Sequence, residues 1–153
     1  MNKRLLSAVI ALVITLGGAN FTLLNAASHG GGHGDHTELG EQMETISKAF
    51  RALRRQASDP AKNADSAELA GKMLAAAKEA AKHDPAWTSE QPKAEQAEFV
   101  AGYKKGMEHM VALLTDLEKA FKAGENDKAG EIIGKLRDAQ KHGHEHYKKP
   151  DDE

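Results

Sequence analysis

The side chains of this sequence that could do chemistry are mainly histidine and methionine. The chain has 153 residues with eight His and five Met but no Cys. The lack of Cys excludes disulfides, thiolate metal sites and a cysteine nucleophile. Any metal or cofactor must therefore be held by imidazole, thioether, carboxylate or backbone groups.

Met43 and His144 combine a thioether with an imidazole. Together these two groups form an axial ligand pair for the iron of an electron-transfer haem, and the thioether favours the reduced iron. Taken singly, a Met on a helical stripe is usually a core residue, and a His in a last helical turn usually interacts with the helix dipole or with solvent. The pair carries chemistry only if the fold brings both side chains to one place.

Three histidines lie close together near the end of the chain. His142 and His146 are four residues apart and share one face of a helix. His144 lies about 200° around the helix from each of them, at roughly 100° per residue, so the three cannot share one ion. The His142/His146 pair is either a solvated polar face or a surface site for Zn²⁺, Cu²⁺ or Ni²⁺ that Glu145 or a second chain completes.

Three further histidines, His29, His33 and His36, lie in the Gly-rich segment 28–36, which we expect to be flexible. Signal cleavage after Ala26 would make His29 the third residue. A free amine with His at position three can surround Cu²⁺ or Ni²⁺ with a square plane of nitrogens. With other cleavage sites a weak His-rich metal scavenger remains an alternative.

Residues 1–27 have the layout of a secretory signal peptide, in which two basic residues precede the apolar run 5–16. This run is shorter than the roughly 20 residues of a membrane span. The alternative is an uncleaved anchor that extends to residue 24. We expect cleavage after Ala26 or Ala27, with Ala19 as a further candidate. An export signal on a Cys-free chain suits the bacterial periplasm, with no membrane segment after cleavage.

Composition favours helices and disfavours a nucleic-acid partner. Aromatic residues make up 5% of the chain and the formal net charge is -2, whereas nucleic-acid binders usually carry a basic patch. Four stretches have apolar residues at spacings of mostly four and three, as bundle helices do. They cover about residues 37–57, 66–83, 92–123 and 126–147. The connections are short, so we predict an all-α, antiparallel up-down-up-down four-helix bundle over residues 37–149, with a tail at 150–153.

The helix ends are predicted from capping residues. Asp35 with Glu38 could form a capping box at the first helix. Asp65 and Asn126 are expected N-caps of the second and fourth helices. Gly124 is expected to end the third helix, which starts near Pro92.

This topology gathers the candidate ligands at one end of the bundle. The starts of the first and third helices share that end with the finishes of the second and fourth. The end collects Leu39, Met43, Ala77, His83, Phe99, Tyr103 and His144. Small residues there leave room for a porphyrin, and the aromatic residues line its faces. Because the chain has no Cys, such a haem would be non-covalent and hence b-type. The other end collects only apolar residues: Leu53, Leu117, Phe121 and Ile133.

From residue 39 to residue 148 the chain resembles the cytochrome b562 family. The matching segments are Leu39-Gly-Glu-Gln-Met43, Lys72-Met73-Leu-Ala-Ala-Ala, Phe99-Val-Ala-Gly102-Tyr103 and His144-Glu-His-Tyr147-Lys148. Cytochrome b562 is itself a standard example of the up-down-up-down bundle, so the resemblance and the predicted fold are not independent.

The resemblance implies a set of site residues. Met43 and His144 would be the axial ligands and Met73 would lie near the haem. Phe99 and Tyr103 would pack on the haem, and Lys148 is the terminal basic residue. The chain departs from the family pattern at three positions, which we expect to loosen the pocket: Gln140, Gly143 and Gly106.

We therefore expect a periplasmic electron-transfer protein that binds one b-type haem, exchanges electrons with unidentified redox proteins and is a monomer or weak oligomer. The alternative is a periplasmic copper-, zinc- or nickel-binding protein on a bundle scaffold. An enzyme is disfavoured because no nucleophile–base set occurs and no catalytic residue stands out. A di-iron bundle would need inward Glu-x-x-His motifs, which the sequence does not supply at the required spacing.

Overall fold

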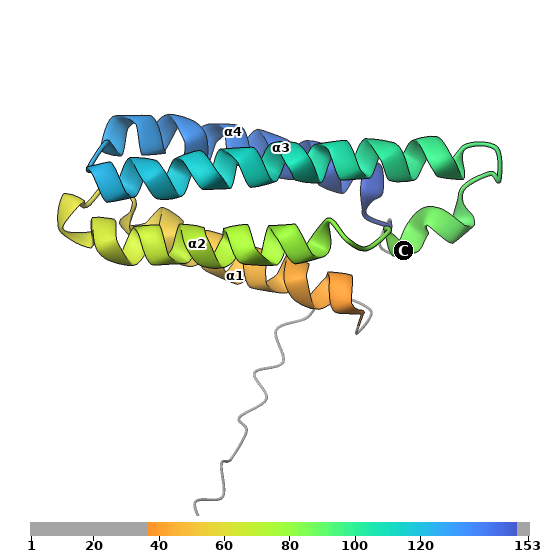
Figure 1. The fold of residues 1–153 in the computed structure, drawn as a ribbon, viewed down its shortest axis with the longest axis horizontal. Helices are drawn as coiled ribbons and strands as arrows, with labels where there is room; N and C mark the ends of the chain where they lie inside the picture. Colours follow the sequence, from red (N-terminus) through yellow and green to blue (C-terminus); the bar gives the residue numbers. More distant parts are fainter. Residues whose placement is uncertain (1–36, 150–153) are drawn as a thin grey trace, which may run out of the picture. The chain divides into compact units, whose positions relative to one another are not determined.

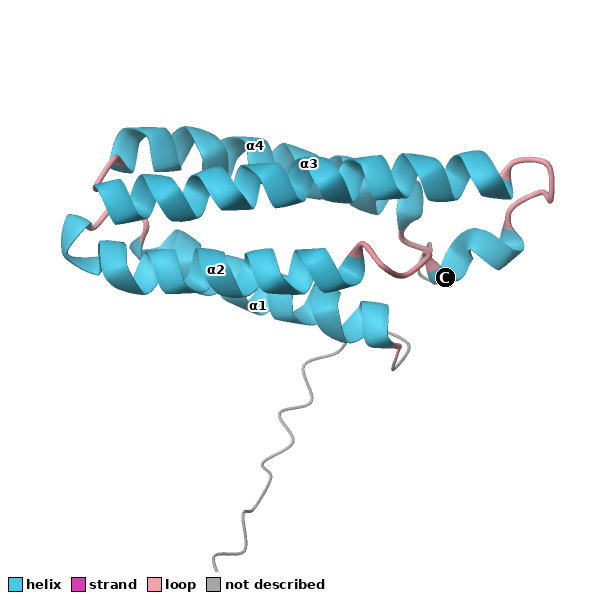
Figure 2. Ribbon diagram, in the orientation of Figure 1, coloured by secondary structure: helices cyan, strands magenta, loops and turns pink. Residues whose placement is uncertain are grey.

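The computed structural model describes residues 37–149, which form four α-helices and two short 3-10 helices and contain no strand (Figures 1 and 2). The elements in chain order are α1 (Glu38–Gln56), η1 (Pro60–Lys62), α2 (Asn63–Ala80), η2 (Ala86–Glu90), α3 (Gln96–Ala123) and α4 (Asn126–Tyr147). The predicted all-α four-helix bundle is confirmed. The predicted signal peptide, the segment 28–36 and the tail 150–153 lie outside the described residues.

Consecutive helices pack against each other: α1 on α2, α2 on α3, and α3 on α4. The pair α1 and α4 is not among the closely packed pairs. Figure 1 shows the α1–α2 and α3–α4 connections at one end of the bundle and the α2–α3 connection at the other. We call these the α3–α4 end and the α2–α3 end. Met43 and His144 both belong to the α2–α3 end, as the topology predicts.

Two predicted N-caps are wrong, because other residues occupy the cap positions. The hydroxyl of Thr37 accepts a hydrogen bond from the Gly40 amide at 3.0 Å, so Thr37, and not Asp35, is the N-cap of α1. At the second helix, η1 precedes α2 and runs directly into it. Asp65 therefore lies in the first turn of α2 and is not its N-cap.

The third helix begins at Gln96, later than predicted, because the carbonyl of Pro92 accepts bonds from the amides of Glu95 and Gln96 at 2.8 and 3.2 Å and closes a separate turn. Its end at Gly124 is confirmed. Gly124 has a φ of 73°, a left-handed conformation that glycine adopts without steric cost.

Asn126 has a different role from the predicted one. The N-cap position of α4 is occupied by Glu125. The Asn126 amide exchanges two hydrogen bonds with the Asn63 side chain, at 3.0 and 2.8 Å, and donates a third to the Ala57 carbonyl at 3.3 Å. Asn126 thus ties the start of α4 to the α1–α2 connection.

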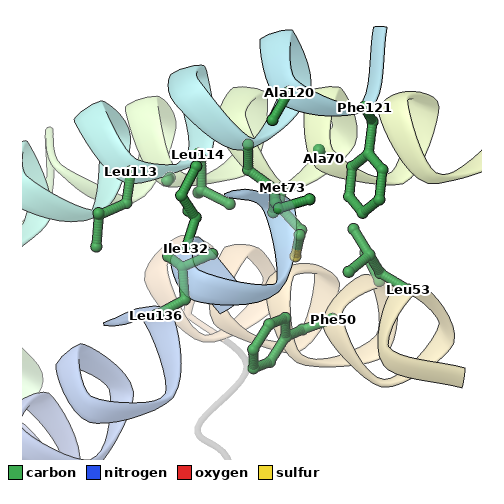
Figure 3. Close-up of a cluster of buried hydrophobic side chains, with 14 of the residues drawn as sticks. Phe50, Leu53, Ala70, Met73, Leu113, Leu114, Ala120, Phe121, Ile132 and Leu136 are labelled. Carbon is green, nitrogen blue, oxygen red and sulfur yellow. The ribbon is translucent and has the colours of Figure 1, made fainter. Parts of the chain in front are cut away.

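The core is continuous through the bundle, and Figure 3 shows its central part. The largest fully buried side chains are Phe121, Leu53, Met73, Leu114 and Leu117. On α3, Met107 is buried and the neighbouring Gly106 is exposed. None of the helices within residues 37–149 is long and apolar enough to span a membrane.

Candidate functional site

Burial along α1 changes between its two halves. All of its buried residues lie in the second half: Ala49, Phe50 and Leu53. The apolar residues of the first half are half-buried and pack only against the edge of the core: Leu39, Met43 and Ile46. The start of α1 therefore presents apolar side chains that the protein covers incompletely.

Burial along α4 changes in the opposite direction, from a buried first half to a half-buried second half. Its buried residues lie in the first half: Ala129, Ile132 and Leu136. In the second half the inward positions are only half-buried: Ala139, Gly143 and Tyr147. Because α1 and α4 are antiparallel, the first half of α1 and the second half of α4 both belong to the α2–α3 end.

The other two helices remain buried at the same end. On α2, Ala77 and Ala80 have no exposed surface, and on α3, Tyr103 and Met107 are 6% and 4% exposed. At this end the reduced burial of inward side chains is thus confined to α1 and α4, the two helices that are not closely packed against each other. These are also the helices that carry the two candidate ligands.

Met43 is half-buried on α1 and packs against the core, which agrees with its predicted place on the apolar stripe. A thioether in this position is next to apolar neighbours and still accessible from one side. It is therefore available as a soft ligand to a group that enters between incompletely covered helices.

His144 does not face the core as its predicted stripe implied: its side chain is exposed. The predicted apolar stripe of this helix runs through Ala129, Ile133, Leu136, Gln140 and His144. Its repeat is slightly longer than 3.6 residues, so it drifts around the helix. At roughly 100° per residue, Tyr147 lies in phase with Ala129, whereas His144 lies about 60° away. His144 consequently lies at the boundary between the inward face and the exposed face of α4, and Tyr147 occupies the inward position.

Phe99 and Tyr103, which were predicted to be site residues, belong to an aromatic cluster that also contains Tyr147 and Trp87. The sequence did not assign Tyr147 or Trp87 to the site. The ring centroid of Tyr147 lies 5.1 Å from that of Phe99 and 5.6 Å from that of Tyr103. Trp87 of η2 packs edge-on against Phe99 at 6.0 Å. A Cβ atom at Gly102 would lie 2.5 Å from the Tyr147 hydroxyl oxygen, so the hydroxyl occupies space that is open because residue 102 is glycine.

Tyr103 is the buried polar group of this end. Its hydroxyl donates a hydrogen bond to the Ala80 carbonyl at 3.1 Å and so joins α3 to the end of α2. Burial, with a smaller contribution from the negative charge of Asp84, raises the pKa of Tyr103 to about 12. The Asp84 carboxylate is itself 3.1 Å from the Lys104 ammonium. Tyr103 is thus held neutral across the physiological range.

Two contacts between chain segments tie this end together at the surface. His83 Nδ1 lies 3.7 Å from a carboxylate oxygen of Glu38, which links the end of α2 to the start of α1. Lys149 Nζ lies 2.9 Å from a carboxylate oxygen of Glu90 in η2. Solvent-exposed pairs of this kind contribute little free energy each, typically below about 1 kcal/mol.

The remaining predicted site residues lie in different environments. Met73 is 1% exposed and points into the core beside Phe50 and Leu53 (Figure 3). Lys148 is exposed at the C-cap of α4. His109 is exposed, whereas His83 is half-buried.

The His142 and His146 rings lie 4.3 Å apart between centroids, which confirms that they share one face of α4. Within residues 37–149 no group of three or more His, Asp or Glu residues could enclose a metal ion. His29, His33 and His36 lie outside the described residues.

The residues present fit a haem by the chemistry of their donor set. A thioether and an imidazole come from two helices that are not closely packed, and aromatic side chains lie at the same end. The chain matches the cytochrome b562 family model over residues 38–148. No curated protein matches it.

Proposed function

Because the chain belongs to the cytochrome b562 family, a family of haem-binding electron-transfer helical proteins, we propose that it is a periplasmic electron carrier. It would hold one non-covalent b-type haem between Met43 and His144. The bundle supplies binding, orientation and electrostatics and performs no catalysis of its own.

The observation that carries this proposal is the matched loss of burial on α1 and α4. The first half of α1 and the second half of α4 leave apolar side chains half-covered, while α2 and α3 stay buried at the same end. Apolar surface left in water costs about 25 cal/mol per Å². A flat apolar ligand inserted at this place would cover that surface, and each helix carries one axial ligand.

The residues around the ligands have separate roles. Phe99 and Tyr103 lie at the same end and would pack against a porphyrin, with Leu39 one helical turn before Met43. Met73 closes the core beneath the site. Lys148, exposed at the end of α4, would pair with a carboxylate at the haem edge.

Bound haem would supply one-electron redox chemistry. The Met43 thioether favours the reduced iron, and the apolar surroundings of Met43 tune the potential by excluding water. The half-exposed edge of α1 and α4 keeps the site close to the surface, which suits exchange of electrons with another protein.

The first test is the optical spectrum of the reconstituted protein and of Met43→Ala. The parent should show the sharp reduced bands of a six-coordinate low-spin haem, and Met43→Ala should give high-spin iron or weaker haem binding. Met110→Ala is the matched control, because Met110 is also a half-buried Met at the edge of the core. An unchanged spectrum in Met43→Ala would remove Met43 as a ligand.

The same measurement on His144→Ala tests the second ligand. We expect loss of the low-spin spectrum, while the control His109→Ala, at another exposed His, keeps it. Retention of low-spin haem in His144→Ala would show that another side chain binds the iron.

Fractionation of cells and the intact mass of the exported chain test the periplasmic location. Recovery of the chain in the cytoplasmic fraction with residues 1–27 still attached would contradict it.

A further inference from the structure

The exposed face of the last two turns of α4 carries two histidines that have no part in the proposed haem site. His142 and His146 are both exposed, and their rings lie 4.3 Å apart with an interplanar angle of 56°. His144 lies about 200° around the helix from each of them. The pair and the proposed axial ligand therefore point to different sides of α4.

We propose that His142 and His146 chelate one Cu²⁺ ion. Each imidazole binds through one ring nitrogen, and water fills the remaining positions. Imidazole nitrogens lie about 2 Å from a bound transition metal. Two rings on successive helical turns whose centroids are already 4.3 Å apart can therefore reach one ion by side-chain rotation alone. Because the backbone of α4 already holds the rings together, little ordering is needed on binding.

The choice of metal follows from the number and type of ligands. With only two protein ligands the site cannot impose a coordination geometry, so affinity follows the intrinsic order of the divalent metals, in which Cu²⁺ binds nitrogen donors most strongly. The lack of a three-residue ligand group within residues 37–149 agrees with an open two-nitrogen site rather than an enclosed one.

The charges near the pair are mixed. The last turn of α4 carries the negative end of the helix dipole, which favours a bound cation. Glu145, three residues after His142, is exposed, and the nearest Lys141 ammonium is 3.9 Å from it, at the limit of an ion pair. Beyond the helix, the Lys149 ammonium is 2.9 Å from a carboxylate oxygen of Glu90. Glu145 is therefore able to offset part of the charge of a copper ion.

The test is calorimetric titration of the exported chain with copper sulfate, with His29, His33 and His36 changed to Gln so that the N-terminal histidines do not contribute. We expect one Cu²⁺ per chain and an electron paramagnetic resonance spectrum with nitrogen ligands. Changes in the second shell of a metal site alone weaken binding by roughly 10–100-fold. His142→Gln or His146→Gln removes a ligand itself, so each should weaken binding by at least about tenfold.

His109→Gln, at an exposed His without a second His on its face, is the matched control and should leave copper binding unchanged. Circular dichroism verifies that each variant is folded, which is expected because both His142 and His146 are exposed. Copper binding that is equally tight in His142→Gln and His146→Gln would overturn the proposal. Binding lost in His144→Gln but kept in these two variants would overturn it as well. Neither result depends on whether haem binds.

Discussion

Tyr103 is a side chain whose environment defines both its packing and its titration. Its ring is 6% exposed, and its hydroxyl has a partner in the Ala80 carbonyl. A buried hydroxyl without a partner would cost free energy, so the hydrogen bond makes burial of the ring possible. The same burial raises the pKa of Tyr103 from 10.0 to about 12.

The raised pKa predicts how stability depends on pH. Between pH 10 and about 12 the unfolded state ionises Tyr103 while the folded state does not, so the contribution of Tyr103 to folding is present below pH 10 and is lost as pH rises toward 12. Tyr103→Phe should lower the free energy of unfolding by about 1 kcal/mol at neutral pH through loss of the hydrogen bond. This difference should shrink in the alkaline range.

Urea denaturation of the parent and of Tyr103→Phe at several pH values measures this difference. A gap that stays constant up to the alkaline limit would mean that Tyr103 is not held neutral by the fold.

At the level of the elements, two glycines of α3 one helical turn apart have different roles. Gly102 lies against Tyr147 of α4, and a Cβ there would be 2.5 Å from the tyrosine hydroxyl oxygen. Gly106 has no atom within 4 Å of the position of a Cβ. Gly102 therefore permits close contact between α3 and the last turn of α4, whereas Gly106 serves no packing purpose within the described residues.

The pair of variants Gly102→Ala and Gly106→Ala separates helix propensity from packing. Alanine in a helix interior is favoured over glycine by up to about 1 kcal/mol, so Gly106→Ala should stabilise the bundle by roughly that amount. Gly102→Ala should lose this gain because Tyr147 must move, and the last turn of α4 moves with it. We also expect weaker haem binding in Gly102→Ala.

Denaturation midpoints and near-ultraviolet circular dichroism of both variants provide the measurement. Equal stabilisation by the two substitutions, with an unchanged aromatic signal, would show that the Tyr147 contact does not constrain α4.

For the described bundle as a whole, the two ends differ in how firmly they are held. At the α3–α4 end, Asn63 and Asn126 exchange hydrogen bonds, and the large buried side chains Leu53 and Phe121 pack below them. At the α2–α3 end the parts of α1 and α4 that carry Met43 and His144 are only half-covered. Regions with little burial open at lower free energy than the core does, so these two segments should be the least protected helical parts.

This asymmetry predicts where a ligand stabilises the protein. A haem that binds only the folded state stabilises it by about 2.7 kcal/mol at a free concentration roughly 100 times its Kd. Amide hydrogen exchange should slow most in residues 38–46 and 139–147, and the unfolding temperature should rise. Removal of the haem should reverse both effects.

Calorimetry and hydrogen exchange with and without haem measure this effect, and the interior of α2, already buried, is the internal control. A gain in protection confined to α2 and α3 would place the ligand elsewhere in the bundle.

The amino-acid sequence alone predicts the fold class, the helix order and the end of the bundle to which Met43 and His144 belong. Apolar periodicity, Pro and Gly are local signals, and they act within a few residues of each other. They placed Met43 on the apolar stripe and ended α3 at Gly124, as observed. The resemblance of four short segments, and not these local signals, indicated the family to which the chain belongs.

Only the tertiary structure decided which side chains turn inward on α4 and where the core is incomplete. The phase of a helix depends on the partner it packs against, and an error of about 0.15 residue per turn accumulates over four turns to about 60° by His144. Gly102, on another helix, leaves space for the Tyr147 hydroxyl. Contacts between residues 45 apart in sequence leave no local signature, so no stripe or capping rule could have identified that space.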